Sequence, residues 1–136
     1  MKVKYIVAHG TYTPVGMEVT PDDIEQWHVK ERGWSKPGYH AIIQPSGRIQ
    51  AILDWDEPGI HVGEFNPISL GFALIGGKGP DGWRFNYTVE QMTALETLFL
   101  QAKAKFPEAK IVGHGDLDEG NPCPGFDVGR MFGWIR

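Results

Sequence analysis

VKYIVAHG, residues 3–10, is the segment on which the fold prediction depends. Val3 to Ala8 form a short apolar run rich in β-branched residues, which is typical of a strand, and His9-Gly10 ends it. Other runs of this kind occupy residues 39–44 and 48–53, which a Pro-Ser-Gly turn joins into a hairpin, and residues 69–75 and 110–112. Because their apolar residues are consecutive rather than alternating, we expect a central mixed sheet that is covered on both faces.

Three segments combine helical spacing with the residues that begin and end helices. Thr20 begins the first helix and Gly33 ends it. A capping box that starts at Thr88 begins a second, longer helix, and Asp127 caps a short last helix. The resulting order β-α-β-β-β-α-β-α shows no repeat and no linker. It predicts one α/β domain over residues 1–136.

The composition fits one globular domain and excludes several other classes of protein. The chain has 136 residues, a formal charge of −4 and 41% hydrophobic residues. No apolar run approaches the roughly 20 residues that cross a bilayer, and the first apolar stretch is shorter than a secretory signal requires. We therefore expect no membrane insertion, and synthesis in the cytoplasm without a signal peptide. Lysine and arginine form no basic cluster beyond a loose group of Lys30, Arg32 and Lys36, so we expect no nucleic-acid partner. We also expect a monomer.

Two histidines have the same position relative to a predicted strand. His9 follows the first strand, and His114 follows the strand at 110–112. If these strands are parallel neighbours, both imidazoles reach one pocket at the carboxyl edge of the sheet. Cys123, the single cysteine, lies between two prolines shortly after His114. Two histidines and a cysteine form a set that zinc takes in catalytic sites, with a fourth position open for water. On spacing alone, the interpretation as turn residues and a small buried thiol is favoured over the metal site.

Four segments, in order along the chain, extend this interpretation. They are IVAHGT around His9, QWHVKERGWSKPGYHAII at 26–43, HVGEFNPISLGFALIGG at 61–77 and GHGDLDEGNPCPGFD at 113–127. Together they resemble the zinc-dependent type-2 N-acetylmuramoyl-L-alanine amidases, a family that includes short phage amidase lysozymes and the peptidoglycan recognition proteins. The resemblance covers nearly the whole chain and is greatest to the phage branch. It implies a central mixed sheet flanked by helices, in agreement with the predicted element order.

The resemblance implies a metal site and a catalytic tyrosine. The metal ligands of the family fall on His9, His114 and Cys123, which would hold one Zn²⁺ ion. The tyrosine of the family's Gly-Tyr-His motif, which lies over the metal-bound water, falls on Tyr39. A phenol in that place can orient the water or stabilise an oxyanion. The acidic residues of the cysteine loop, Asp118 among them, are interpreted as a solvated face.

The resemblance also implies a substrate groove, and it reveals one departure. His61 and Asn66 fall on the stretch that borders the groove in the family, and Trp34 belongs to the segment that leads to Tyr39; all three are assigned to substrate binding. Phage members carry a catalytic lysine two residues before the cysteine ligand, where this chain has Asn121. Asparagine offers a neutral donor in place of a full positive charge. This change bears on the catalytic rate more than on the metal site.

The sequence therefore predicts a cell-wall lytic amidase of the phage endolysin type, which hydrolyses the amide between N-acetylmuramic acid and L-alanine of peptidoglycan. Two alternatives stay open. One is a peptidoglycan-recognition module without catalysis, which Asn121 favours and the intact ligand set opposes. The other is a thiol hydrolase with Cys123 as nucleophile and His114 as base. Cys123 lacks the helix N-terminal setting that lowers a thiol pKa, which disfavours that third function.

Overall fold

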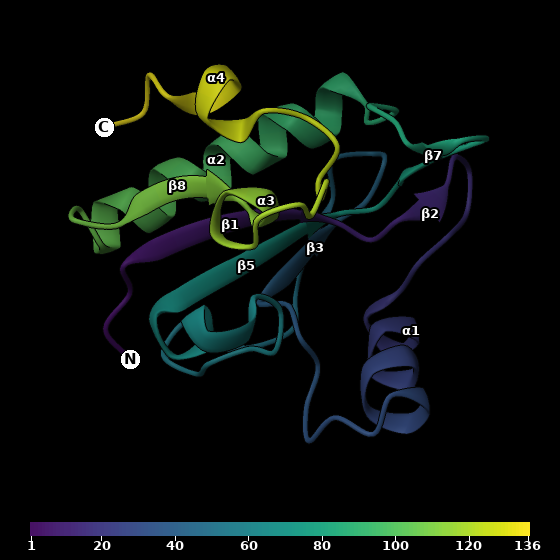
Figure 1. Ribbon diagram of the computed structural model, residues 1–136, viewed down its shortest axis with the longest axis horizontal. Helices are drawn as coiled ribbons and strands as arrows, with labels where there is room; N and C mark the ends of the chain where they lie inside the picture. The colour runs from purple at the N-terminus through teal and green to yellow at the C-terminus, as the bar shows by residue number, and fades with distance from the viewer.

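A five-stranded mixed sheet in the order β4-β3-β5-β1-β8 forms the centre of the computed structural model, which describes residues 1–136 (Figure 1). β1 (Tyr5–Gly10) lies between β5 (Ser69–Leu74) and β8 (Lys110–Gly113) and is parallel to both. β3 (Ala41–Ile43) runs parallel to β5, and β4 (Ile49–Ala51) pairs with β3 as the predicted antiparallel hairpin. The predicted mixed sheet is confirmed.

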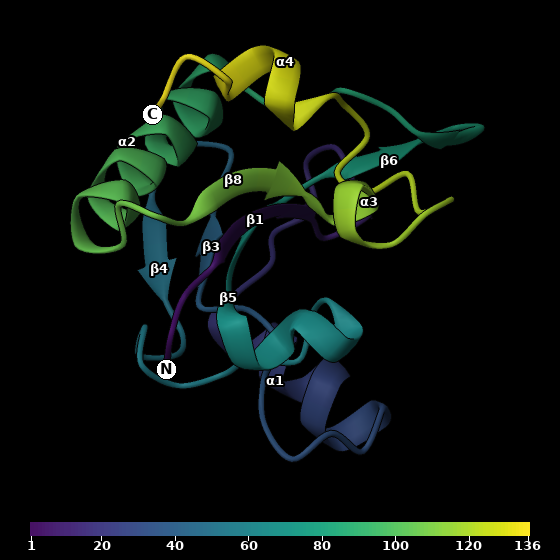
Figure 2. The same ribbon diagram turned by 60° about the vertical axis from the view of Figure 1, so that its left-hand side comes forward.

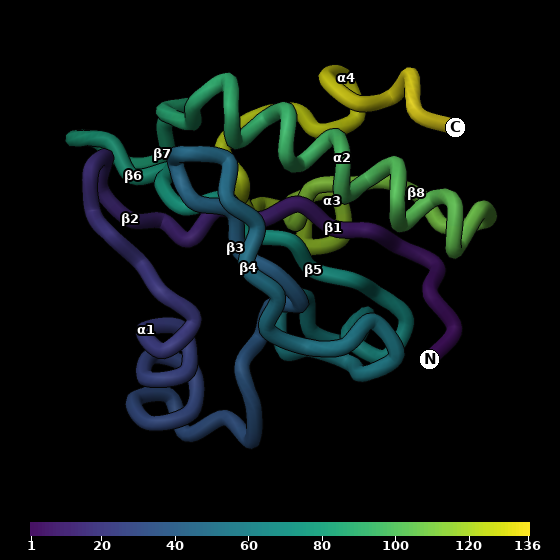
Figure 3. The backbone as a smooth tube through the Cα atoms, turned by 180° about the vertical axis from the view of Figure 1, so that it is seen from behind, coloured from purple at the N-terminus to yellow at the C-terminus, as the bar shows by residue number.

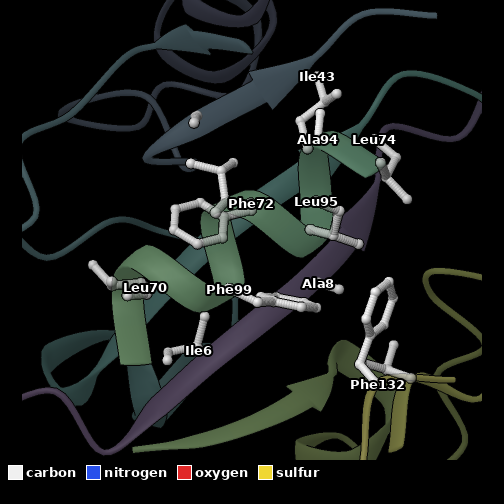
Figure 4. Packing of buried hydrophobic residues seen from close by; sticks show 14 of the residues in the cluster. Ile6, Ala8, Ile43, Leu70, Phe72, Leu74, Ala94, Leu95, Phe99 and Phe132 are labelled. Atoms are coloured by element: carbon white, nitrogen blue, oxygen red, sulfur yellow. The ribbon is translucent and has the colours of Figure 1, made fainter. Parts of the chain in front are cut away.

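Helices cover both faces of this sheet. α2 (Val89–Lys105) and α4 (Val128–Phe132) lie on one face, and α1 (Pro21–Glu25) lies on the other side (Figure 1). The larger apolar cluster fills the space under α2, where Leu95 and Phe99 meet Phe72 of the sheet and Phe132 of α4 (Figure 4). A smaller cluster on the other face includes Ile24 of α1. None of the helices is long and apolar enough to span a bilayer.

The helix starts follow the predicted caps. The Thr20 hydroxyl accepts the Asp23 N–H at 3.1 Å, and the Thr88 hydroxyl accepts the Gln91 N–H at 3.0 Å. The Asp127 carboxylate likewise accepts the Arg130 N–H at 3.0 Å. These bonds satisfy backbone donors that have no partner within the helix. Local sequence is sufficient to predict where these three helices begin.

The first helix differs from its prediction in its second half. After five α-helical residues the chain continues as a π-helix, η1 (Gln26–Glu31), and the Arg32 N–H bonds to the Trp27 carbonyl five residues back. This wider turn is a small rearrangement of hydrogen bonds within a continuous helical segment. The spacing of apolar residues does not distinguish it from an α-helix.

Several short elements are absent from the sequence prediction. β2 (Thr13–Pro14), β6 (Gly77–Gly79) and β7 (Gly82–Trp83) form a second, three-stranded sheet, and η2 (Gly63–Ile68) and α3 (His114–Leu117) are short helices. Elements of two to six residues, rich in glycine and proline, are too short to show a period. Figure 2 shows the β6–β7 hairpin and the loop after α3 projecting in the same direction.

The register of β1 and β8 fixes where the predicted site forms. Ala8 pairs with Gly113, and His9 and His114 are the next residues along the two strands. The two histidines therefore lie at neighbouring positions on the same edge of the sheet. Both chain termini lie at the other end of the molecule, away from α1 (Figure 3). The condition set by the sequence, that the two strands be parallel neighbours, is met.

Candidate active site

Three potential metal ligands converge at the carboxyl edge of β1 and β8. The ligand atoms of His9, His114 and Cys123 all lie within 4.8 Å of one another. These residues line a cleft of about 240 Å³. His9 and Cys123 are almost fully buried, with 2% and 7% of their surfaces exposed. The site therefore combines a shielded floor with an opening at the cleft.

The loop after α3 carries Cys123 back to the end of β1. The Cys123 carbonyl accepts the Gly115 N–H at 3.1 Å, and the Cys123 N–H donates to the Asn121 side-chain oxygen at 3.0 Å. The Gly10 N–H points at the Cys123 sulfur, 3.3 Å away. Backbone contacts on both sides thus hold the sulfur in place beside His9.

His9 is oriented by a second histidine. Its Nε2 lies 2.8 Å from Nδ1 of His61, and its Nδ1 lies 3.8 Å from the Cys123 sulfur. When His9 donates from Nε2 to His61, its Nδ1 keeps a lone pair directed toward the other ligands. The His61 ring fits because residue 71 is glycine, where a Cβ atom would lie 2.6 Å from the His61 Nδ1. Metal-bound histidines characteristically donate their second N–H to a neighbouring acceptor in this way.

His114 has a corresponding partner on the solvent side. Its Nε2 lies 3.4 Å from a carboxylate oxygen of Asp118 and 3.5 Å from the amide nitrogen of Asn121. A proton on Nε2 that is shared with Asp118 leaves Nδ1 as the free ligand nitrogen of His114. This arrangement is the carboxylate–histidine pair that commonly supports a bound metal.

The donor set fits zinc in number and kind, and one ligand pair already has the spacing of a zinc site. Bonds of about 2.0–2.3 Å to a tetrahedral zinc place the ligand atoms roughly 3.3–3.8 Å apart. The sulfur-to-nitrogen distance of 3.8 Å between Cys123 and His9 lies within that range. Burial raises the pKa of the Cys123 thiol to about 12, so the protein alone does not stabilise a reactive thiolate. The site is suited to a metal ligand rather than to a free cysteine nucleophile.

Burial also decides the charge of the imidazoles. It lowers the pKa of His9 well below the ordinary value, and the neighbouring His61 and His114 lower it further. It lowers the pKa of His61 to about 3 and that of His114 as well, although Asp118 opposes the shift at His114. The three rings are therefore neutral at pH 7, which is the form that binds metals.

Tyr39 lies beside this group of histidines. Its ring centroid is 5.3 Å from that of His9, and it lines the same cleft. Burial raises the pKa of the Tyr39 phenol, and the nearby Cys123 raises it further. The hydroxyl therefore keeps its proton at neutral pH and is able to donate a hydrogen bond into the cleft.

The other predicted site residues have varied surroundings. Trp34 and Asn121 line the cleft. His61 also borders the cleft, but its ring is buried and its Nδ1 is hydrogen-bonded to His9. Asn66 accepts the backbone N–H groups of His61 and Val62 at 3.0 and 2.8 Å, so its side-chain oxygen shapes the chain around His61. Substrate binding by these residues, and catalysis by Asn121, stay predictions.

Two contributions were missed by the sequence analysis. Asp118, interpreted as part of a solvated face, is exposed as expected but also contacts His114, and the spacing of four residues between them in HGDLD was the available signal. Arg32 brings a permanent positive charge to the cleft, with its guanidinium carbon 5.1 Å from the Trp34 ring centroid. No motif marked Arg32, because its place depends on the turn that follows η1.

Comparisons with known proteins agree with this geometry. A family model described as N-acetylmuramoyl-L-alanine amidase matches residues 1–126. The endolysin of Klebsiella phage KP32 is 38% identical over 128 residues, which cover 93% of this chain and 83% of that protein. The Ph2119 endolysin from the Thermus scotoductus MAT2119 bacteriophage superposes with a TM-score of 0.80 at 34% identity, covering 96% of this chain and 82% of that one. A Drosophila PGRP-LB mutant in complex with tracheal cytotoxin gives a TM-score of 0.80 at 26% identity, covering 98% and 82%.

The contact between His61 and His9 predicts that metal affinity depends on residue 61. His61→Phe removes the acceptor for His9 Nε2 and should weaken Zn²⁺ binding about 10- to 100-fold. His61→Gln retains an acceptor and should recover most of this loss. Competition with a fluorescent chelator measures the affinity, and circular dichroism checks that each variant is folded. Parental zinc affinity in folded His61→Phe would contradict the orienting role.

Proposed function

This chain belongs to the N-acetylmuramoyl-L-alanine amidase family, and from that premise we propose that it works with one Zn²⁺ ion held by His9, His114 and Cys123. It is a peptidoglycan amidase, and its relatives include phage endolysins and peptidoglycan recognition proteins. The bond that it hydrolyses joins the lactyl group of N-acetylmuramic acid to L-alanine. We propose the lytic role of the phage relatives for this chain, with the cell wall as its site of action.

One observation carries the metal assignment. The three donors converge from two strand ends and a loop, and the outward nitrogens of both histidines already have protein partners, His61 and Asp118. Each ring is therefore left with its Nδ1 for the common centre. A group of turn residues would have no reason to be oriented in this way.

The protein's own residues have distinct tasks around that centre. Bound zinc supplies a Lewis acid that polarises the amide carbonyl and makes water available as a nucleophile at neutral pH. His61 and Asp118 fix the directions of the two histidine ligands. Tyr39 lines the cleft with a hydroxyl that stays protonated, and this hydroxyl would donate to the oxygen of the amide as negative charge develops there. Arg32 is suited to bind a carboxylate of the stem peptide.

Asn121 takes the place of the lysine that the phage amidases carry. Its side-chain oxygen accepts from the Cys123 N–H, and its amide nitrogen lies 3.1 Å from a carboxylate oxygen of Asp118. These contacts support a structural role for Asn121, which holds the cysteine loop in its conformation. This role is additional to its predicted place at the reaction centre. The phenol of Tyr39 is then the neutral donor best placed to act on the substrate oxygen.

The identity of the cleaved bond tests this function most simply. Amide hydrolysis frees the α-amine of L-alanine and leaves the glycan strand intact, whereas a glycosidase creates reducing ends. Digests of purified peptidoglycan should gain N-terminal alanine in proportion to the loss of turbidity, with no rise in reducing ends. Cys123→Ser, which lacks one zinc ligand, serves as the inactive control. New reducing ends, amines from within the stem peptide, or binding without cleavage would contradict the proposal; the last result would favour the recognition module.

Tyr39→Phe isolates the contribution of one hydroxyl. The ring volume is kept, so stability and zinc content should stay close to those of the parent. Loss of a donor to the developing oxyanion should lower kcat about 10²-fold or more, with a smaller effect on KM. Steady-state kinetics on a soluble muropeptide measures both constants. A kcat within about threefold of the parent would assign Tyr39 to packing alone.

A further inference from the structure

Two aromatic side chains form a wall that the catalytic machinery leaves unexplained. The ring centroids of Tyr12 and Trp83 lie 4.7 Å apart, with an angle of 43° between the ring planes. Both residues line the catalytic cleft, and both also line a neighbouring, open hollow of about 540 Å³. We call this pair the aromatic wall. It stands where the cleft continues into the hollow.

Tyr12 is held in a conformation that a tyrosine rarely adopts. Its φ is +55°, in the left-handed region, and it is the one non-glycine residue of the chain with a positive φ. The residues on either side are anchored: the Thr11 N–H bonds to the Leu74 carbonyl at 2.9 Å, and the Thr13 N–H bonds to the Gly76 carbonyl at 3.0 Å. Strained backbone of this kind persists where the surroundings impose it, often at binding sites. The side chain nevertheless stays 39% exposed.

Trp83 packs against glycine backbone as well as against the Tyr12 ring. A Cβ atom on Gly77 would lie 2.7 Å from the Trp83 ring, and one on Gly10 would lie 2.8 Å from it. Glycine at both positions therefore lets the indole rest against the ends of the sheet. On the other side, the Lys78 ammonium lies 5.5 Å from the Tyr12 ring centroid. The aromatic wall is thus fixed in place before any ligand arrives.

The opposite side of the hollow is polar and acidic. It is formed by residues 118–122, which include Asp118, Glu119 and Asn121, and no lysine or arginine lines the hollow. Figure 2 shows the β6–β7 hairpin, which carries Trp83, and the loop after α3 on the same side of the molecule. An aromatic surface that faces hydrogen-bond acceptors matches a pyranose ring, which has an apolar C–H face and hydroxyl or amide donors around its edge.

The charges of the cleft distinguish the two halves of the substrate. The stem peptide carries free carboxylates, which the acidic hollow would repel. Arg32 lines the cleft but not the hollow, and it would attract these carboxylates. The glycan sugars carry no charge once the lactyl carboxyl is in the amide bond. We propose that the hollow binds a sugar ring of the glycan strand against the aromatic wall. This inference rests on the proposed amidase function and assigns the glycan side of its substrate.

The test compares two substrates that differ only in the sugar. One is a disaccharide muropeptide, GlcNAc-MurNAc-tetrapeptide, and the other is the same tetrapeptide acylated with D-lactate. Tyr12→Asn removes the ring, and asparagine tolerates the left-handed backbone at this position. Tyr12→Phe retains the ring and serves as the matched control. The measured quantity is kcat/KM on each substrate, together with inhibition by the peptide-free disaccharide GlcNAc-MurNAc whose lactyl carboxyl is capped as an amide, so that it carries no charge.

Tyr12→Asn should lower kcat/KM on the muropeptide about 3- to 10-fold, mainly through KM, and leave the lactoyl peptide within twofold of the parent. The disaccharide should inhibit this variant more weakly by about the same factor, while Tyr12→Phe behaves as the parent in both assays. Equal losses on the two substrates, or no loss on the muropeptide, overturn the glycan assignment and leave the amidase function intact. If the parent cleaves neither substrate, the amidase function fails and the glycan assignment fails with it.

Discussion

The parallel pairing of β1 with β8 is the constraint on which the rest of the site depends. Ala8 and Gly113 are register partners, so His9 and His114 leave the sheet side by side although they are far apart in the sequence. β1 is buried along almost its whole length, and Ile111 of β8 packs against the larger apolar cluster, which resists a change of register. The chain needs only one further loop, the one that carries Cys123, to complete a three-ligand set.

The residues that support these ligands leave some buried polar atoms without hydrogen-bond partners. His61 bonds to His9 through Nδ1, and its Nε2 is buried without a hydrogen-bond partner, as is the nearby Ser69 hydroxyl. An unsatisfied buried polar atom is unfavourable by about 1–3 kcal/mol. Asp118 supports His114 from the solvent side, where the contact with the carboxylate is less costly.

The sequence was sufficient for those features that local patterns determine. The strands around His9 and His114 follow from runs of apolar residues, and the starts of α1, α2 and α4 follow from the caps at Thr20, Thr88 and Asp127. The ligand triad followed from the placement of His9, His114 and Cys123 together with a family resemblance. The contacts of His61 and Asp118 did not follow, because they depend on how loops of irregular structure pack. The small β2-β6-β7 sheet was not predicted either, because strands of two and three residues are too short to show a periodic pattern.

X-ray absorption at the zinc edge of the zinc-loaded protein tests the central claim, that His9, His114 and Cys123 together hold the metal. A zinc ion held by these three residues should be four-coordinate, with one sulfur at about 2.3 Å and nitrogen or oxygen ligands at about 2.0–2.1 Å, including two imidazoles. Cys123→Ser should abolish the sulfur contribution, since the chain has one cysteine. A zinc shell without sulfur, or one with fewer than two imidazoles, would rule out this set of three ligands.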